Sequence, residues 1–143
     1  MTTAQDHVDV IDTTVQKTYA WIKYLSAELG DLGRRESFDI LRAFLHTLRD
    51  RLTVDEAAQL GAQLPLLLRG AYYEAWDPSK APVKLSREEF VDRFARRAVL
   101  KDPIDPVRAL RAAARTVRRH ISEGEYEDIL AGMPQELREL LAV

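Results

Sequence analysis

The sequence predicts an all-α fold, a compact bundle of about eight helices built from two related helical repeats. Apolar residues recur every three or four positions along most of the 143-residue chain, and no stretch shows the sustained alternation that marks a strand. A serine or threonine followed three positions later by a glutamate or glutamine precedes several of these runs, which is a signature of helix starts. Two segments of 29 residues, 69 positions apart, are also similar in sequence.

The composition fits a single globular domain over residues 1–143. Hydrophobic residues make up 46% of the chain and charged residues 31%, a balance that argues against a disordered or fibrous protein. The absence of cysteine excludes disulfides, thiolate metal sites and cysteine nucleophiles, and it fits a reducing compartment. The N-terminus has no basic start followed by an apolar run, and no window approaches 18 uninterrupted apolar residues. We therefore expect a cytoplasmic protein with no membrane partner.

The first helix is expected to run from Thr13 or Thr14 to Leu29. Thr13 and Gln16 have the spacing of a capping box, in which the threonine oxygen accepts a free backbone amide and the glutamine reaches back. Gly30 supplies the left-handed residue that commonly ends a helix. The expected core stripe consists of Val15, Thr18, Ile22, Leu25 and Leu29, with Trp21 beside it.

Three more helices complete the first half. Three-four spacing of apolar residues predicts a helix over about 34–51. Thr53 and Glu56 open a short helix that must end before Pro65, because proline disfavours helical geometry in the residue that precedes it. Pro65 itself suits the first turn of a fourth helix, which reaches roughly Ala75.

The second half is expected to contain four further helices. Residues 77–85 hold two prolines and no apolar periodicity, which indicates a linker between the halves. The expected helix starts beyond it are Ser86 with Glu89, Asp105 with Pro106, Ser122 with Glu125, and Pro134.

The repeated segment is the strongest evidence for two related halves. Residues 41–69 and 110–138 align without a gap and share ten identities in 29 positions, where unrelated segments of this composition would share roughly two. The proline and both cap positions of the short helix also match. A helical unit of this kind cannot bury its apolar face alone, so we expect the two copies to pack together. The repeats cover about 13–76 and 86–141.

Several motifs of the chain resemble those of a known family. They are Leu-Arg-Ala at 41–43, Ala-Ala-Gln-Leu-Gly-Ala-Gln-Leu-Pro at 57–65, Tyr-Tyr-Glu-Ala-Trp at 72–76, and "SREEFVDRF" at 86–94. With them the chain resembles the bacterial family catalogued as "domain of unknown function 2267", over nearly its whole length. The resemblance implies a helical, internally repeated fold in a bacterial protein, and it implies no reaction or catalytic residue.

Candidate catalytic and metal-binding residues are few. His46 and Asp50 lie four positions apart on one helical face, a spacing that suits a metal ion or an acid–base pair. Two ligands do not make a metal site, however, and the Glu-x-x-His spacing of helical di-metal sites is missing. Nucleophile and phosphate-loop motifs are missing too. We expect no cofactor, and the sequence favours a non-enzymatic protein.

A row of arginines is the first candidate binding surface. Residues 87–119 carry ten Lys or Arg against five Asp or Glu, although the whole chain has a net charge of −2. Within the helix expected at 106–120, four arginines follow three-four-three spacing and form one continuous row. The guanidinium group suits phosphate oxygens, so the row is a candidate site for an anion or for nucleic acid. Acidic groups elsewhere in the protein are the alternative partners. The row consists of Arg108, Arg111, Arg115 and Arg118, and Arg93, Arg96 and Arg97 extend it.

The second candidate surface is a segment in which the two copies differ. Leu66 and Leu67 are replaced by Gln135 and Glu136 in the second copy, so the fourth helix is apolar on nearly every side. Such a helix is either central in the core or presents an apolar patch to a partner. The candidate partner-binding residues are Leu66, Leu67, Tyr72, Tyr73 and Trp76.

The copies also differ in the size of their core side chains. Phe44 and Leu45 give way to Ala113 and Ala114, which either lets a helix approach closely or opens a pocket. The function that the sequence favours is a non-catalytic helical interaction module that binds a protein partner or itself. The alternative is an anion- or nucleic-acid-binding module that uses the arginine row.

Overall fold

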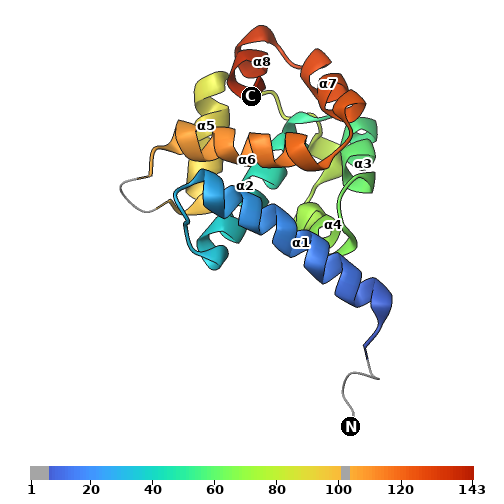
Figure 1. The fold of residues 1–143 in the computed structure, drawn as a ribbon. Coiled ribbons are helices and arrows are strands. Elements are labelled where there is room, and N and C mark those ends of the chain that lie inside the picture. The colour runs from blue at the N-terminus through green and yellow to red at the C-terminus, as the bar shows by residue number, and fades with distance from the viewer. Residues whose placement is uncertain (1–6, 101–103) are drawn as a thin grey trace.

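The computed structural model describes residues 7–100 and 104–143 and confirms the all-α prediction (Figure 1). Within these two ranges the chain forms eight α-helices and one short 3₁₀ helix, with no strand. The helices are α1 (Asp9–Glu28), α2 (Arg34–Arg51), α3 (Val54–Ala62), α4 (Leu66–Tyr73), η2 (Pro78–Lys80), α5 (Arg87–Ala98), α6 (Pro106–His120), α7 (Glu123–Ala131) and α8 (Gln135–Leu141).

Helices α2 and α6 form the centre of the bundle. Helix α2 packs against α1, α4, α5 and α6, and α6 also contacts α1, α5 and α8. Figure 1 shows α6 crossing the bundle over α2. Ala113 and Ala114 have no exposed surface and belong to the main hydrophobic core. The small side chains of α6 therefore allow close helix packing at the position where the first copy carries Phe44 and Leu45.

Three helix starts follow the predicted capping chemistry in full. Thr53 and Ser86 each begin a complete capping box, with Glu56 and Glu89 returning to the backbone amide of the cap residue. Asp105 accepts a hydrogen bond from the backbone amide of Arg108 and so caps α6. These starts depend on residues close together in sequence, and for that reason the sequence predicts them well.

The predicted start of the first helix is wrong. Helix α1 begins at Asp9, so Thr13 lies inside it and forms no capping box with Gln16. Asp9 and Asp12 place negative charge in the first turn, where the helix dipole favours it. The helix ends at Glu28, one residue before the predicted Leu29, and the predicted left-handed conformation of Gly30 is confirmed, with φ +70°.

Two further predictions about helix ends need correction. At α7 only half of the predicted capping box forms: Ser122 caps the amide of Glu125, but the Ser122 amide donates to Gln63 Oε1 from the other half of the chain. Helix α4 ends at Tyr73, two residues earlier than predicted, and Pro65 is its N-cap residue and not part of its first turn. In both places a contact from a distant element replaces a local one.

Candidate interaction surface

One face of α1 carries apolar side chains that the bundle leaves uncovered. Val8, Ile11, Val15 and Tyr19 follow three-four-four spacing and therefore share that face. Val8, Ile11 and Tyr19 are each exposed by more than half, and Val15 is half-buried. The amino-terminal end of α1 projects past the other helices (Figure 1), which explains why no other described helix covers it.

Helix α4 adds two more exposed leucines beside α1. Leu66 is 56% and Leu67 43% exposed, and the Leu67 amide donates to Thr14 Oγ1 over 2.8 Å, which fixes α4 against α1. Leu67 lines a pocket of about 380 Å³ together with Val15, Tyr19 and Phe38, and Leu66 lines a groove of about 780 Å³ on the other side of α1. We call the following residues the α1–α4 surface: Val8, Val10, Ile11, Val15, Tyr19, Leu66 and Leu67.

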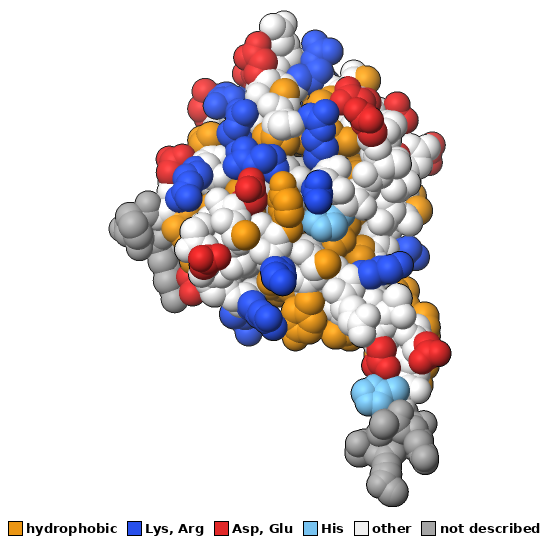
Figure 2. Space-filling model, in the orientation of Figure 1, with side chains coloured by type: hydrophobic (Ala, Val, Ile, Leu, Met, Phe, Trp, Pro, Cys, Tyr) orange, Lys and Arg blue, Asp and Glu red, His pale blue; other side chains and the backbone are white. Residues whose placement is uncertain are grey.

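Charged groups of both signs border the α1–α4 surface. Arg34 and Arg35 line the smaller pocket, and the Arg34 guanidinium carbon lies 5.4 Å from the centroid of the Tyr19 ring. Lys17 lines the larger groove. Asp9 and Asp12 occupy the projecting end of α1. Figure 2 shows this mixture, with hydrophobic and basic side chains side by side and acidic side chains near the projecting end.

The predicted partner-binding residues do not all reach the surface. Leu66 and Leu67 are exposed, so a core position is wrong for them. Tyr72 is completely buried and its hydroxyl donates to the Ala57 carbonyl over 2.8 Å, which corrects its assignment to a partner-binding surface. Burial also raises the pKa of Tyr72. Tyr73 and Trp76 are half-buried and pack against the core.

Most arginines in the α6 row form hydrogen bonds or ion pairs with other parts of the protein. Arg111 donates to the carbonyls of Glu139 and Ala142 in α8 and just after it. Arg115 forms an ion pair of 2.5 Å with Glu28 of α1.

Two arginines of the row differ in how they are used. Arg118 donates to the Val143 carbonyl and lies 3.7 Å from a carboxylate oxygen of Glu127. Arg108, by contrast, is exposed at the start of the helix. The row therefore ties α6 to α1, α7 and the end of the chain.

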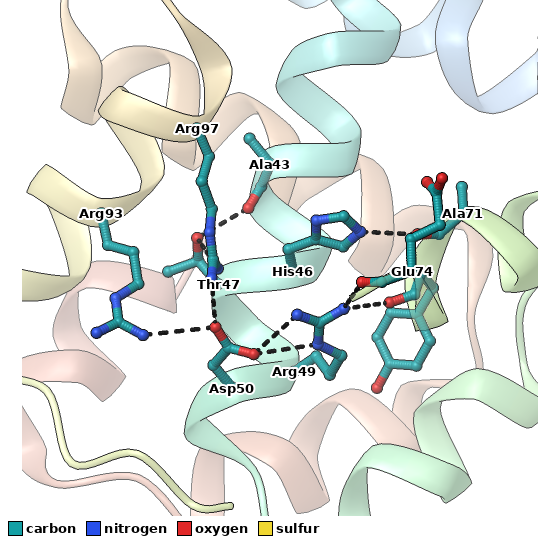
Figure 3. Close-up of polar contacts among 10 residues, drawn as sticks. Ala43, His46, Thr47, Arg49, Asp50, Ala71, Glu74, Arg93 and Arg97 are labelled. Carbon is teal, nitrogen blue, oxygen red and sulfur yellow. Dashed lines mark hydrogen bonds and ion pairs between the residues drawn. The ribbon is translucent and has the colours of Figure 1, made fainter. Parts of the chain in front are cut away.

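A buried polar network lies where α2 meets α4 and α5 (Figure 3). Arg49 is only 2% exposed, and its guanidinium donates to the carbonyls of Tyr72 and Glu74 and to Asp50 Oδ1, over 2.7–2.9 Å. Asp50 also accepts from Arg97 over 2.6 Å. This network closes the carboxyl end of α4, whose last carbonyls have no partner within the helix.

The electrostatics of the network follow from its contacts. Burial alone would raise the pKa of Asp50, but hydrogen bonds and charge from Arg97 and Arg49 outweigh it and lower that pKa. Burial lowers the pKa of His46, and the nearby Arg49 and Arg97 add to the effect. The His46 ring forms a hydrogen bond with the Ala71 carbonyl of α4 over 2.7 Å, whereas the Asp50 carboxylate accepts hydrogen bonds from arginines. The two residues therefore bind different groups instead of forming an acid–base pair.

Sequence reasoning did not find the Arg49 network. The available signal was an arginine on a largely apolar face of α2, matched by Arg118 in the second copy, but sequence alone does not locate its acceptors on α4. Within residues 7–100 and 104–143, no group of three or more His, Asp or Glu is placed to hold a metal ion. In the same two ranges no helix is long and apolar enough to cross a membrane.

The fold and these surfaces define a small all-α helical domain. The chain belongs to the family described as "Uncharacterized conserved protein (DUF2267)", whose model matches residues 18–140. No curated protein is similar to it in sequence.

Proposed function

We propose that this protein is a non-catalytic interaction module that binds a protein partner through the α1–α4 surface. The observation that carries the proposal is the set of large apolar side chains that α1 and α4 leave exposed along the two sides of α1. Single exposed leucines are ordinary, but a patch assembled from two elements and rimmed by charge is typical of a binding surface. The absence of cysteine favours a cytoplasmic setting for this module.

The shape of the surface supports a helical or extended segment as the bound element. A groove and a pocket flank α1 on its two sides; the pocket is mainly apolar, the groove has a mixed lining, and basic residues line both. A partner that inserts apolar side chains there would bury them against Val15, Tyr19 and Leu67. Binding of this kind is driven mainly by apolar burial, so we expect it to tolerate salt.

The arginine row is the weaker candidate for the function. Arg111, Arg115 and Arg118 already donate to carbonyls or to a carboxylate, so an incoming anion would have to compete with these contacts. No aromatic side chain interleaves the row to stack on bases. An anion-binding module would also show affinity that falls steeply with salt.

A site-specific photo-crosslinking experiment tests the proposal. A photoreactive amino acid replaces Leu67 in one version of the chain and Val54, which is equally exposed on α3, in a control version. In native cells we expect a discrete protein adduct from position 67 and none from position 54. The partner, once purified, should bind the parent chain and lose binding to Leu67→Asp. Equal adducts at both positions, or none at position 67, would contradict the proposal.

A further inference from the structure

The α1–α4 surface has a feature that identifies its occupant: it contains both parts of a self-complementary contact. The projecting end of α1 is an apolar helix end with two acids, Val8-Asp9-Val10-Ile11-Asp12. The pocket of about 380 Å³ farther along the same helix is apolar and has two arginines at its edge, Arg34 and Arg35. The first is the kind of segment that the second would bind.

We propose that the occupant is a second copy of this chain, with the two α1 helices packed antiparallel about a two-fold axis near Val15. This inference rests on the proposed function and names the partner of that surface. In a two-fold contact each surface patch meets the same patch of the other copy, so residue pairs occur twice. A single favourable contact between helix end and pocket is therefore made two times.

The spacing along α1 satisfies the two-fold requirement. Ile11 and Tyr19 lie four residues before and four residues after Val15, about 6 Å in each direction along the helix. An antiparallel pair centred on Val15 sets Ile11 of each copy against Tyr19 of the other. The stripe on this face has the three-four spacing that closely packed helix pairs use.

The charges agree with the same arrangement. Asp12 lies one residue beyond Ile11, so it reaches the other copy near Tyr19, where Arg34 is held over the ring. Among the described residues, the Asp12 side chain pairs with His7, which is exposed, over 3.0 Å. Arg35 is 86% exposed and its contact to Asp39 is 3.4 Å long. Asp12 and Arg35 can therefore exchange these contacts for new ones with the second copy at little cost in free energy, since exposed ion pairs contribute little to stability.

The bundle itself shows why the contact stabilises α1. The apolar stripe of α1 continues towards the amino terminus past Thr14, the residue whose hydroxyl accepts the Leu67 amide of α4. Val8, Val10 and Ile11 beyond that point are each exposed by more than half. A second α1 packed on the Val15 face would cover Val8 and Ile11, and it would also cover Leu67, the wall of the pocket.

Sedimentation of the full chain over a concentration series tests the inference. We expect a monomer–dimer equilibrium in the parent chain, and monomer throughout for Ile11→Asp and Leu67→Asp. Val54→Asp is the matched control, because Val54 is as exposed as Leu67 but lies outside the α1–α4 surface, and it should dimerise like the parent. Circular dichroism and thermal melting should show that all three variants remain folded. A parent chain that stays monomeric at the highest concentration overturns the inference.

The antiparallel register of the two α1 helices can be tested by disulfide cross-linking, because the chain has no cysteine of its own that would react. Val15→Cys lies on the proposed axis and should form a disulfide-linked homodimer under mild oxidation, whereas Val54→Cys should not. Asp12→Lys and Arg34→Glu should each weaken dimerisation by about two- to fivefold, and the double variant should recover it. Equal cross-linking at both cysteines, or no recovery, overturns the antiparallel arrangement.

The outcomes separate this inference from the proposed function. A monomeric parent chain together with an adduct to a different protein at position 67 would reject the second copy and support the interaction module. A monomeric chain with no adduct would reject both.

Discussion

Arg49 shows how one charged residue determines where a helix ends. It is nearly inaccessible to water, yet its guanidinium reaches the Tyr72 and Glu74 carbonyls that α4 leaves without helical partners. Asp50 balances its charge from the adjacent position. The desolvation of such a charge is costly, and the arrangement is tolerated because four of the five N–H groups of Arg49 donate to an acceptor.

Replacing Arg49 with methionine should therefore destabilise the protein strongly. Arg49→Met removes the donor from the Tyr72 and Glu74 carbonyls and one of the arginine partners of Asp50, and we expect a loss of about 3 kcal/mol in the free energy of unfolding. Arg42→Met is the control, because the contacts of Arg42 to Glu74 over 3.5 Å and to the Phe38 ring are partly exposed, and it should cost less than about 1 kcal/mol. Urea denaturation measures both values. Equal losses in the two variants would show that the buried network is not special.

The negative charge of Glu125 lowers the stability of the folded state. Burial raises its pKa, and the nearby Asp128 and Glu56 carboxylates raise it further. A carboxyl group with a raised pKa in the folded state favours the neutral form there. Its contribution to stability is full below the pKa of the unfolded chain and is lost as the pH rises through the pKa of the folded state.

Glu125→Gln should consequently raise the melting temperature at neutral pH. Glutamine has no charge to desolvate and remains acceptable at the third position of a helix. The advantage should shrink as the pH falls and vanish below about pH 4, where the parent glutamate is also neutral. Melting curves of the two proteins from acid to neutral pH test this, and Glu123→Gln, an exposed residue of the same helix, is the control. A constant difference at all pH values would contradict the explanation.

At the scale of single elements, local sequence predicts where helices lie but not how their ends are satisfied. The bounds of α2 were predicted to the residue, because a long apolar stripe and nearby turns define them. The Ser122 cap of α7 was predicted, but the contacts of Gln63 to α7 and of Arg49 and Thr14 to α4 were not, since these three residues lie far away in sequence. A sequence pattern has no access to a partner that folding brings from more than 20 residues away.

Thr14 provides a test of such a distant cap. Its hydroxyl accepts the Leu67 amide at the start of α4, where Pro65 is the N-cap residue and makes no side-chain cap. Thr14→Val keeps the shape but removes the acceptor, and we expect a loss of about 1 kcal/mol and faster hydrogen exchange at Leu67. Thr13→Val is the control because Thr13 is exposed on the same helix. Unchanged exchange at Leu67 would contradict the capping role.

The two halves also correspond in the positions of their helices, although their common origin stays a prediction. The bounds of α7 lie 69 residues beyond those of α3 at both ends. In the first half the Tyr72 hydroxyl of α4 donates to Ala57 of α3, whereas in the second half Tyr126 of α7 donates to Leu141 of α8. Ala57 matches Tyr126, and Tyr72 matches Leu141, so each half makes the same link with the donor and acceptor helices exchanged.

At the scale of the whole molecule, the sequence could not show which faces remain open. The exposed leucines of α4 and the core leucines are chemically alike, and only the packing of α1 and α4 makes Leu66 and Leu67 part of a surface. Likewise, the arginine row looks accessible on a helical wheel. Its acceptors lie on α1, α7 and after α8, far from α6 in sequence. The fold class was predictable because it depends on periodicity, whereas the site depends on tertiary placement.

The arginine row should accordingly behave as a brace between helices more than as a binding site for anions. Arg111→Glu with Arg115→Glu removes the contacts to α8 and places a carboxylate against Glu28, and we expect a loss of roughly 2 kcal/mol in the free energy of unfolding. The matched control is Lys84→Glu with Arg108→Glu, which changes the net charge equally at two exposed positions and should be nearly neutral.

Fluorescence anisotropy of labelled single- and double-stranded nucleic acid, at low and high salt, gives the second readout. We expect no tight binding by the parent chain, because most of these guanidinium groups already face protein acceptors. Tight binding that collapses with salt and is lost in a still-folded Arg111→Glu/Arg115→Glu variant would instead make the row the functional surface of the protein.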